Sequence, residues 1–177
     1  LKTKEFKSLY ADVKGGWESL SRDCQLDTDM ALRLPSDYIN DVEERLSIYK
    51  ALNQVTREDD LRAFSDGLVD RFGQLPTEAI DLIDSMKLRW MGEAMGLEKL
   101  VLKGKKMLAY FPEDPDKAPP QKVLMPFLEA LQRNPSRFRM KQKNGRITLV
   151  VEAVDTMTEA MTLLIQLSPN DNLPLSS

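Results

Sequence analysis

The stretch RFRMKQKNGRITLVVE, residues 137–152, contains the strongest local structural signal in the sequence. An Asn-Gly pair provides the two positive-φ positions of a type I′ turn, so Asn144 and Gly145 predict a two-residue β-hairpin. The turn also fixes which residues face each other. The expected partners are Met140 with Leu149, Phe138 with Val151, and Arg137 with Glu152.

The segments on either side of this hairpin predict further elements. Two apolar runs, 98–104 and 106–111, surround a turn at Gly104 and indicate a second hairpin. Residues 121–133 have helical spacing, with Pro126 near the start, where a missing amide hydrogen is tolerated. Asp155 is expected to cap a last helix, whose apolar residues are Met157, Met161, Leu164 and Ile165.

The segment CQLDTDMALRL, residues 24–34, alternates apolar and polar residues and predicts a long half-buried strand that ends at Pro35. Three helices are expected after it, over 37–55, 56–72 and 77–95, with N-caps at Ser36, Thr56 and Thr77. Gly73 is the expected end of the second helix. The third should be the most buried, with apolar residues including Ile80, Ile83, Trp90, Met91 and Met95.

This order of elements predicts the α+β class. We expect a single domain with a mostly antiparallel sheet, built from a long N-terminal strand and two hairpins. A three-helix segment and two further helices should cover it. We expect residues 23–168 to form this domain, 1–22 an arm that connects it to an upstream domain, and 169–177 a flexible tail. Because the chain starts at Leu1, we interpret it as a piece of a longer protein.

The composition excludes several classes of chemistry. The 177 residues carry 25 Lys+Arg, 28 Asp+Glu, one Cys and no His, with a net charge of −3. A His-based catalytic triad, a His-ligated zinc and an internal disulfide are therefore impossible within the chain. No phosphate-binding glycine motif is present. The lone Cys24, at an apolar position of its strand, fits a core residue in a reducing compartment. We expect a cytoplasmic domain without catalytic residues, metal, cofactor or membrane contact.

Two polar clusters have competing interpretations. Asp27 and Asp29 share one strand face and could hold a hard cation, but a solvated strand surface is the preferred interpretation. Several cations follow one face of the last hairpin: Arg137, Arg139, Lys141, Lys143 and, after the turn, Arg146. They could follow a nucleic-acid backbone. The alternative is a solvated sheet face or a charged edge strand that prevents aggregation.

The helix expected over 56–72 has a core stripe and a polar face. Leu61, Phe64, Leu68 and Phe72 fall on one side of it. Asp66 and Asp70 point away from that stripe, while Gly67 leaves a notch without a side chain and Arg71 borders the buried face. Arg71 could cap a carbonyl or pair with Asp81 or Asp84. The notch could receive a side chain of a partner; an incidental glycine on an acidic face is the alternative.

At these residues the sequence resembles a known family. LPSDYINDVEERLSIYKAL (34–52), GLVDRFGQLPTEAIDLI (67–83) and AMGLEKL (94–100) are similar to the C-terminal domain of the bacterial transcription-repair coupling factor (Mfd). The likeness covers about 24–166. Its specific features are P-x-x-Y-I, R-L-x-x-Y and D-R-F-G-x-L-P in this order.

The resemblance implies a regulatory role. In the family, the parent is an ATP-driven DNA translocase that acts on stalled RNA polymerase and recruits repair through UvrA. The C-terminal domain packs on a UvrB-like module of the same polypeptide, masks its UvrA-binding surface and restrains the motor. The contacts implied for this chain are Asp70 and Arg71, with Asp66 and Gly67 beside them. Family members can carry an acid where Gly67 stands, so that contact is missing or replaced here. A nucleic-acid-binding accessory domain is the alternative function.

Overall fold

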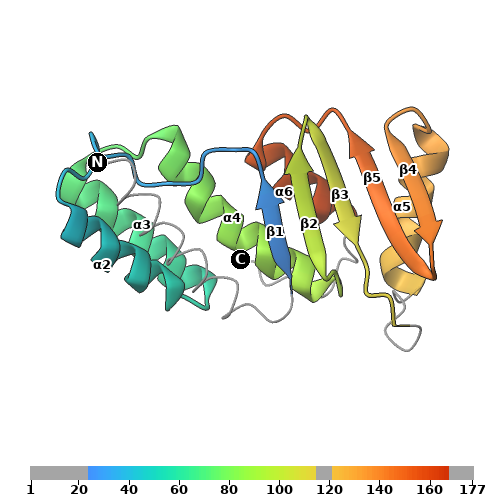
Figure 1. Cartoon of the computed structure of the whole chain (residues 1–177), viewed down its shortest axis with the longest axis horizontal. Helices are drawn as coiled ribbons and strands as arrows, with labels where there is room; N and C mark the ends of the chain where they lie inside the picture. The colour runs from blue at the N-terminus through green and yellow to red at the C-terminus, as the bar shows by residue number, and fades with distance from the viewer. Residues whose placement is uncertain (1–23, 115–120, 168–177) are drawn as a thin grey trace.

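The computed structural model describes residues 24–114 and 121–167, shown in Figure 1. The expected arm and tail lie outside these residues. The elements in chain order are β1 (Gln25–Thr28), α2 (Val42–Asn53), α3 (Glu58–Phe72), α4 (Thr77–Ala94), β2 (Lys99–Lys103), β3 (Lys106–Tyr110), α5 (Gln121–Arg133), β4 (Phe138–Lys143), β5 (Arg146–Glu152) and α6 (Met157–Leu167). The chain is a single α+β domain, as predicted.

The strands form one five-stranded sheet in the order β1-β2-β3-β5-β4. Among the described strands, β1 and β2 pair in parallel and the other three pairs are antiparallel. The last hairpin has the predicted register, with Phe138 opposite Val151 and Met140 opposite Leu149. Asn144 and Gly145 both have positive φ, 53° and 79°, as a type I′ turn requires.

The first strand is much shorter than predicted, because β1 ends at Thr28 instead of continuing to residue 34. The Thr28 hydroxyl donates to the carbonyl of Leu102 at 2.8 Å and accepts from the amide of Met30 at 3.1 Å. The Asp29 amide still donates to the Leu102 carbonyl at 3.2 Å, and β2 ends one residue later, at Lys103. The following residues leave the sheet and cross to the helices (Figure 1), where Leu34 is buried.

The helix starts also differ from the predictions. Residues 36–39 form a turn, and α2 is capped by Asp41, whose carboxylate accepts from the Glu44 amide at 2.8 Å. The sequence predicts N-caps at Ser36, Thr56, Thr77 and Asp155, and each of these predictions is wrong by one residue or more. The N-cap of α3 is Arg57 and that of α4 is Pro76. Before α6 the Thr156 hydroxyl accepts from the Glu159 amide at 3.1 Å, which places the cap one residue after Asp155.

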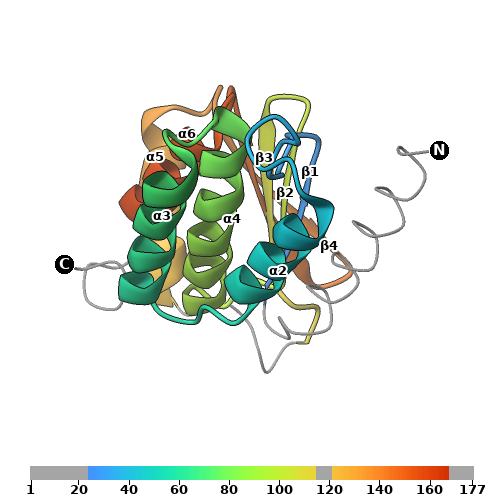
Figure 2. The same cartoon turned by 90° about the vertical axis from the view of Figure 1, so that its left-hand side faces the viewer.

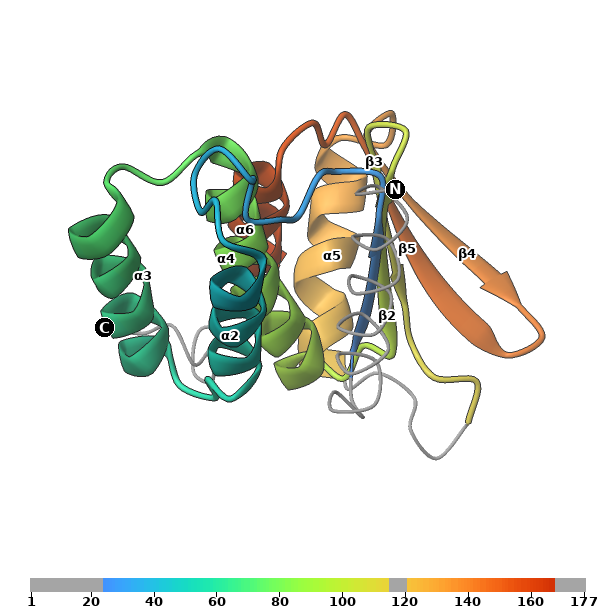
Figure 3. The ribbon, with the colours of Figure 1, turned by 60° about the vertical axis from the view of Figure 1, so that its left-hand side comes forward.

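Two hydrophobic clusters share helix α4. The larger contains residues of the sheet together with α5, α6 and the C-terminal half of α4. The smaller joins α2 and α3 to the N-terminal half of α4. Helices α4, α5 and α6 lie on one face of the sheet (Figure 2). Helices α2 and α3 lie beyond the β1 edge of the sheet (Figure 1), and α3 lies farthest from the strands in Figure 3. As predicted, α4 is the most buried of the first three helices, although Ile80 is exposed.

Cys24 is a core residue, as predicted. It is 2% exposed and lies against α4 at Gly92. Burial raises the pKa of the Cys24 thiol to about 12, and the carboxylate of Glu93 adds to the rise while Arg89 opposes it. The thiol therefore stays protonated at neutral pH and packs as a small apolar group.

Candidate functional site

The C-terminal half of α3 contains the four residues that the sequence predicts as a partner interface: Asp66, Gly67, Asp70 and Arg71. Leu61 and Leu68 are buried in the smaller cluster, and Phe64 and Phe72 pack against it, so the core stripe is the one predicted. Asp66, Asp70 and Arg71 are exposed. Within the described residues, Asp66 and Asp70 have no ion-pair partner. The helix ends where expected, because Gly73 has a φ of 86° and donates its amide to the Val69 carbonyl at 2.9 Å.

Gly67 leaves an open notch in this surface. A Cβ atom added there would meet nothing within 4 Å, apart from the backbone of its own helix. The glycine is therefore not required by packing. The notch lies on the same end of α3 as Asp70 and Arg71, which agrees with the predicted helical positions.

Arg71 does not pair with Asp81 or Asp84, the two partners considered from the sequence. Its guanidinium forms an ion pair with Glu44 of α2 and lies 4.8 Å from the ring centre of Phe72. Asp81 and Asp84 lie on α4, where burial raises the pKa of each carboxyl group. Arg71 thus links the end of α3 to the first turn of α2.

Tyr38 holds the end of α3 from the preceding loop, a role that the sequence reasoning missed. Its hydroxyl lies 2.8 Å from the Gly73 carbonyl and 3.2 Å from the Leu68 carbonyl, as donor to both. Its ring meets Phe72 edge to face, with centroids 5.8 Å apart. Burial raises the pKa of Tyr38, so the hydroxyl remains a donor. The one signal was the P-x-x-Y-I motif, which marks Tyr38 but not its contacts.

A buried arginine supports the Tyr38 loop. Arg45 is 5% exposed, and its Nη1 donates to the carbonyls of Ile39 at 2.5 Å and Asn40 at 3.2 Å. These bonds satisfy backbone groups that the turn before α2 leaves outside any helix. The loop is thereby fixed against α2, and Tyr38 is fixed against α3.

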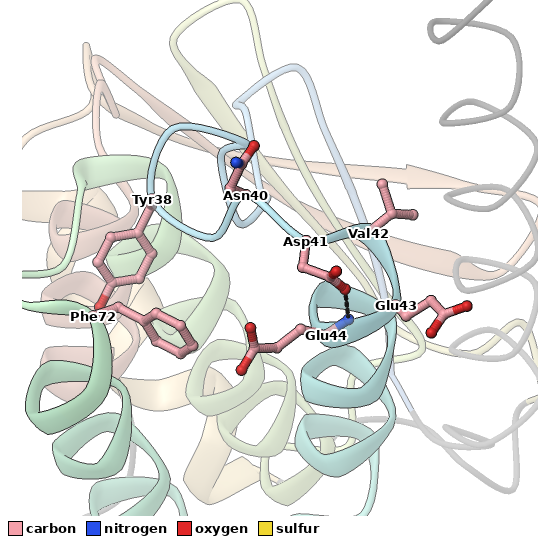
Figure 4. A pocket seen from close by; sticks show the side chains of 7 residues that line it. All are labelled: Tyr38, Asn40, Asp41, Val42, Glu43, Glu44 and Phe72. Carbon is pink, nitrogen blue, oxygen red and sulfur yellow. Dashed lines mark hydrogen bonds between the residues drawn. The ribbon is translucent and has the colours of Figure 1, made fainter.

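A groove separates this loop and the first turn of α2 from the end of α3 (Figure 4). It has a volume of about 740 Å³ and is lined by Tyr38, Asn40, Asp41, Val42, Glu43, Glu44 and Phe72. The aromatic rings of Tyr38 and Phe72 lie on one side in Figure 4, and Asp41 and Glu44 face them from α2. We call this feature the α2–α3 groove.

The basic residues of the last hairpin lie at the other end of the molecule from α3 (Figure 1). Arg139 forms an ion pair with Glu152, which Lys106 also contacts at 3.4 Å. Arg137 donates to the Glu152 carbonyl at 3.2 Å rather than to its carboxylate. The single carboxylate of Glu152 is thus shared between Arg139 and Lys106, whereas Arg137 is held by carbonyl groups that leave its charge in place.

The other cations of the hairpin divide into two groups. Arg146 pairs with Glu98 at 2.6 Å and Glu113 at 3.6 Å, and lies over the Tyr110 ring. Lys141 and Lys143 form no ion pair within residues 24–114 and 121–167. Phe138 faces the helices, so these lysines point from the opposite face of β4. The structure therefore brings together a smaller free positive surface than the sequence suggested.

The two aspartates considered for a cation have structural partners. Asp27 pairs with Lys103 at 2.9 Å, and Asp29 accepts from the amide of Gly104 at 3.0 Å. Among the residues that the structure describes, no group of three or more metal-ligating side chains lies close enough to hold an ion. None of the described helices combines the length and the apolar character of a membrane span.

Comparison with known proteins places these features in a family. The family model named TRCF domain matches residues 28–122, more than half of the chain. Over 80 residues the chain is 38% identical to the transcription-repair-coupling factor of Escherichia coli K12, which covers 45% of this chain and 7% of that protein. The corresponding protein of Myxococcus xanthus is 34% identical over 89 residues, covering 44% and 7%. The chain thus spans a small fraction of these relatives.

A solved structure supports the same assignment at the level of fold. The crystal structure of the C-terminal domain of transcription-repair coupling factor matches with a TM-score of 0.64 and 17% sequence identity, covering 85% of this chain and 96% of that one. The family model matches more than half of the chain, including the loop with Tyr38 and the whole of α3. The chain therefore belongs to the TRCF domain family of transcription-repair coupling factors.

Proposed function

We propose that the chain is a non-catalytic regulatory domain of a transcription-coupled DNA repair translocase. In this proposal the end of α3 docks on the UvrB-like module of the same polypeptide, masks its UvrA-binding surface and restrains the motor. Engagement of RNA polymerase by the parent releases the domain, and contact with DNA is made through the parent motor. Membership of the TRCF domain family supports the proposal.

The observation that carries the proposal is the charged end of α3, together with the contacts that hold it in place. Asp70 and Arg71 are exposed, while Tyr38 and Glu44 hold the turn that presents them. A surface of this kind suits a reversible contact, because rim charges determine specificity and association rate more than affinity. Asp66 lies on the same exposed face and can supply the charge that Gly67 lacks.

The test is an Asp70→Ala, Arg71→Ala double variant of the full-length protein, assayed for UvrA binding without RNA polymerase. We expect tighter UvrA binding, because each loss of about 1.4 kcal/mol from the closed form changes the open-to-closed ratio tenfold. The matched control is Arg57→Ala, Asp59→Ala, which removes one exposed ion pair at the opposite end of α3. Unchanged UvrA affinity in the first variant, with a normal thermal melt, would remove Asp70 and Arg71 from the mechanism.

The alternative function is nucleic-acid binding by the last hairpin. Lys141 and Lys143 are its free cations within the described chain, since the three arginines have acidic or carbonyl partners. A duplex-DNA gel-shift assay on this chain, with Lys141→Glu, Lys143→Glu as the comparison, decides between the two. A salt-sensitive shift that the double variant abolishes would favour this function over masking.

A further inference from the structure

The α2–α3 groove has two chemically different walls. The rings of Tyr38 and Phe72 form one, and the side chains of Asp41 and Glu44 form the other (Figure 4). Glu43 is also in the lining, but its side chain points away from the rings in Figure 4. The Asp41 carboxylate accepts a hydrogen bond from the Glu44 amide. Within the described residues, the Glu43 side chain has no hydrogen-bond or ion-pair partner. Val42, also in the lining, is 45% exposed. The groove is open, partly apolar and negatively charged.

One cation already uses part of this chemistry. The Arg71 guanidinium pairs with Glu44 and lies 4.8 Å from the ring centre of Phe72. Guanidinium groups combine these two contacts readily, because the planar ion stacks on an aromatic ring while its edge binds a carboxylate. The contact of Arg71 with Glu44 and Phe72 shows that this side of the groove fits a guanidinium group.

The charge around the groove exceeds what Arg71 balances. Asp41 and Glu44 place two formal negative charges opposite the rings and Glu43 adds a third nearby, whereas the lining itself contains no basic residue. Asp70, one residue from Arg71, is exposed and has no ion-pair partner in the described chain. A partner that covers this surface with an apolar or acidic patch would leave these carboxylates desolvated and unpaired, which is unfavourable.

We propose that the α2–α3 groove receives an arginine side chain from the protein surface on which the domain docks. The incoming guanidinium replaces Arg71 in the ion pair with Glu44 and in the contact with the Phe72 ring. The displaced Arg71 side chain can then contact the partner. This inference rests on the proposed function, since it assigns a ligand to the groove beside the same end of α3. The ion pair between Arg71 and Glu44 is exchanged for one between Glu44 and the partner's arginine. The net gain in binding free energy is therefore small, and the contact is reversible.

The experiment is a titration of this chain followed by backbone amide NMR. The probe is a short peptide with one arginine, and the matched probe has citrulline in its place, which keeps the side-chain shape and lacks the charge. At constant ionic strength we expect saturable shifts of the Asn40, Glu44 and Phe72 amides with the arginine peptide only. Equal shifts with citrulline, or shifts confined to another acidic region such as Asp59 and Asp60, would overturn the proposal.

Three variants sharpen the test. Arg71→Gln removes the competing guanidinium and should tighten peptide binding by about threefold, and Glu44→Gln should weaken it by about as much, as expected for one surface ion pair. Glu78→Gln is the control, because Glu78 also pairs with an arginine, Arg33, at 3.3 Å but does not line this groove. Weaker binding in Arg71→Gln, or the same loss in Glu78→Gln, would contradict the exchange.

The outcomes of this experiment and of the masking experiment can be told apart. If the peptide fails to bind while the Asp70→Ala, Arg71→Ala variant of the full-length protein gains UvrA binding, the groove proposal is wrong and the masking proposal stands. If the peptide binds as described while UvrA binding is unchanged, the groove receives a basic partner other than the masked module.

Discussion

Gly92 and Cys24 lie so close together that a side chain at position 92 would collide with the thiol. A Cβ atom on Gly92 would be 2.6 Å from the Cys24 Sγ and 3.1 Å from a methyl carbon of Leu100. Gly92 is inside α4, where glycine is a poor helix former. The contact between α4 and the first two strands explains why glycine stands there.

Gly92→Ala should therefore destabilise the chain even though alanine favours the helix. We expect a loss of about 1–3 kcal/mol in the free energy of unfolding, the usual effect of overpacking a core. The control is Gly67→Ala in α3, where an added Cβ meets nothing within 4 Å and should stabilise by up to about 1 kcal/mol. Urea denaturation measures both. If Cys24→Ala does not restore part of the loss in Gly92→Ala, the collision with sulfur is not its cause.

Gly145→Val should destabilise the last hairpin. Gly145 has a φ of 79°, which a β-branched residue adopts only with strain of about 1–3 kcal/mol. Asn144→Gly is the matched variant, because a φ of 53° at this position suits glycine, and it should leave the thermal melting temperature nearly unchanged. A Gly145→Val protein that melts like the parent would show that the turn does not determine the register.

Tyr38→Phe should loosen the end of α3. The change removes the hydroxyl that donates to the carbonyls of Gly73 and Leu68, at a cost of about 0.5–1.5 kcal/mol in unfolding free energy. We also expect faster hydrogen exchange of the amide of Gly73, which closes the last turn of α3. Tyr110→Phe is the control, since its hydroxyl makes no hydrogen bond in the described residues. Equal effects of the two changes would contradict this role of Tyr38.

Asp84→Asn should stabilise the chain at neutral pH. Burial raises the pKa of Asp84 above its usual value of 3.8, with Lys87 opposing the rise and Asp81 adding to it. The folded chain therefore binds this proton more tightly than the unfolded chain, and stability is lost as the pH rises from about 4 through the raised pKa. The advantage of Asp84→Asn should be larger at pH 7 than at pH 4 in thermal melts. Asp70→Asn, an exposed aspartate, controls for the change in charge; an equal advantage there would exclude burial as the cause.

The sequence predicted the elements whose signals are local. The Asn144–Gly145 turn determines its own register, and Gly73 ends α3 by its backbone freedom alone. The alternation in 24–34 correctly predicted that Cys24 and Leu34 are buried, but not that they lie in different clusters. Alternation indicates which side chains are buried, but not whether a neighbouring strand is present. The strand β2 continues for only one residue, Lys103, beyond the partner of Thr28, so most of 29–34 has no strand beside it.

The candidate site was predicted in part for the same reason. The exposure of Asp66 and Asp70 follows from the periodicity of a single helix. The partner of Arg71 does not, because Glu44 is 27 residues away and reaches it only through the packing of α2 against α3. The groove has walls from both segments, so periodicity within either one could not reveal it.

Helix α4 belongs to both hydrophobic clusters, and this has a consequence for unfolding. Its 18 residues form a rod of about 27 Å that runs from the helical end of the domain to the sheet. Neither end can loosen without exposing apolar residues on the helix they share. We therefore expect α2 and α3 to unfold together with the sheet, so that denaturation follows a single transition.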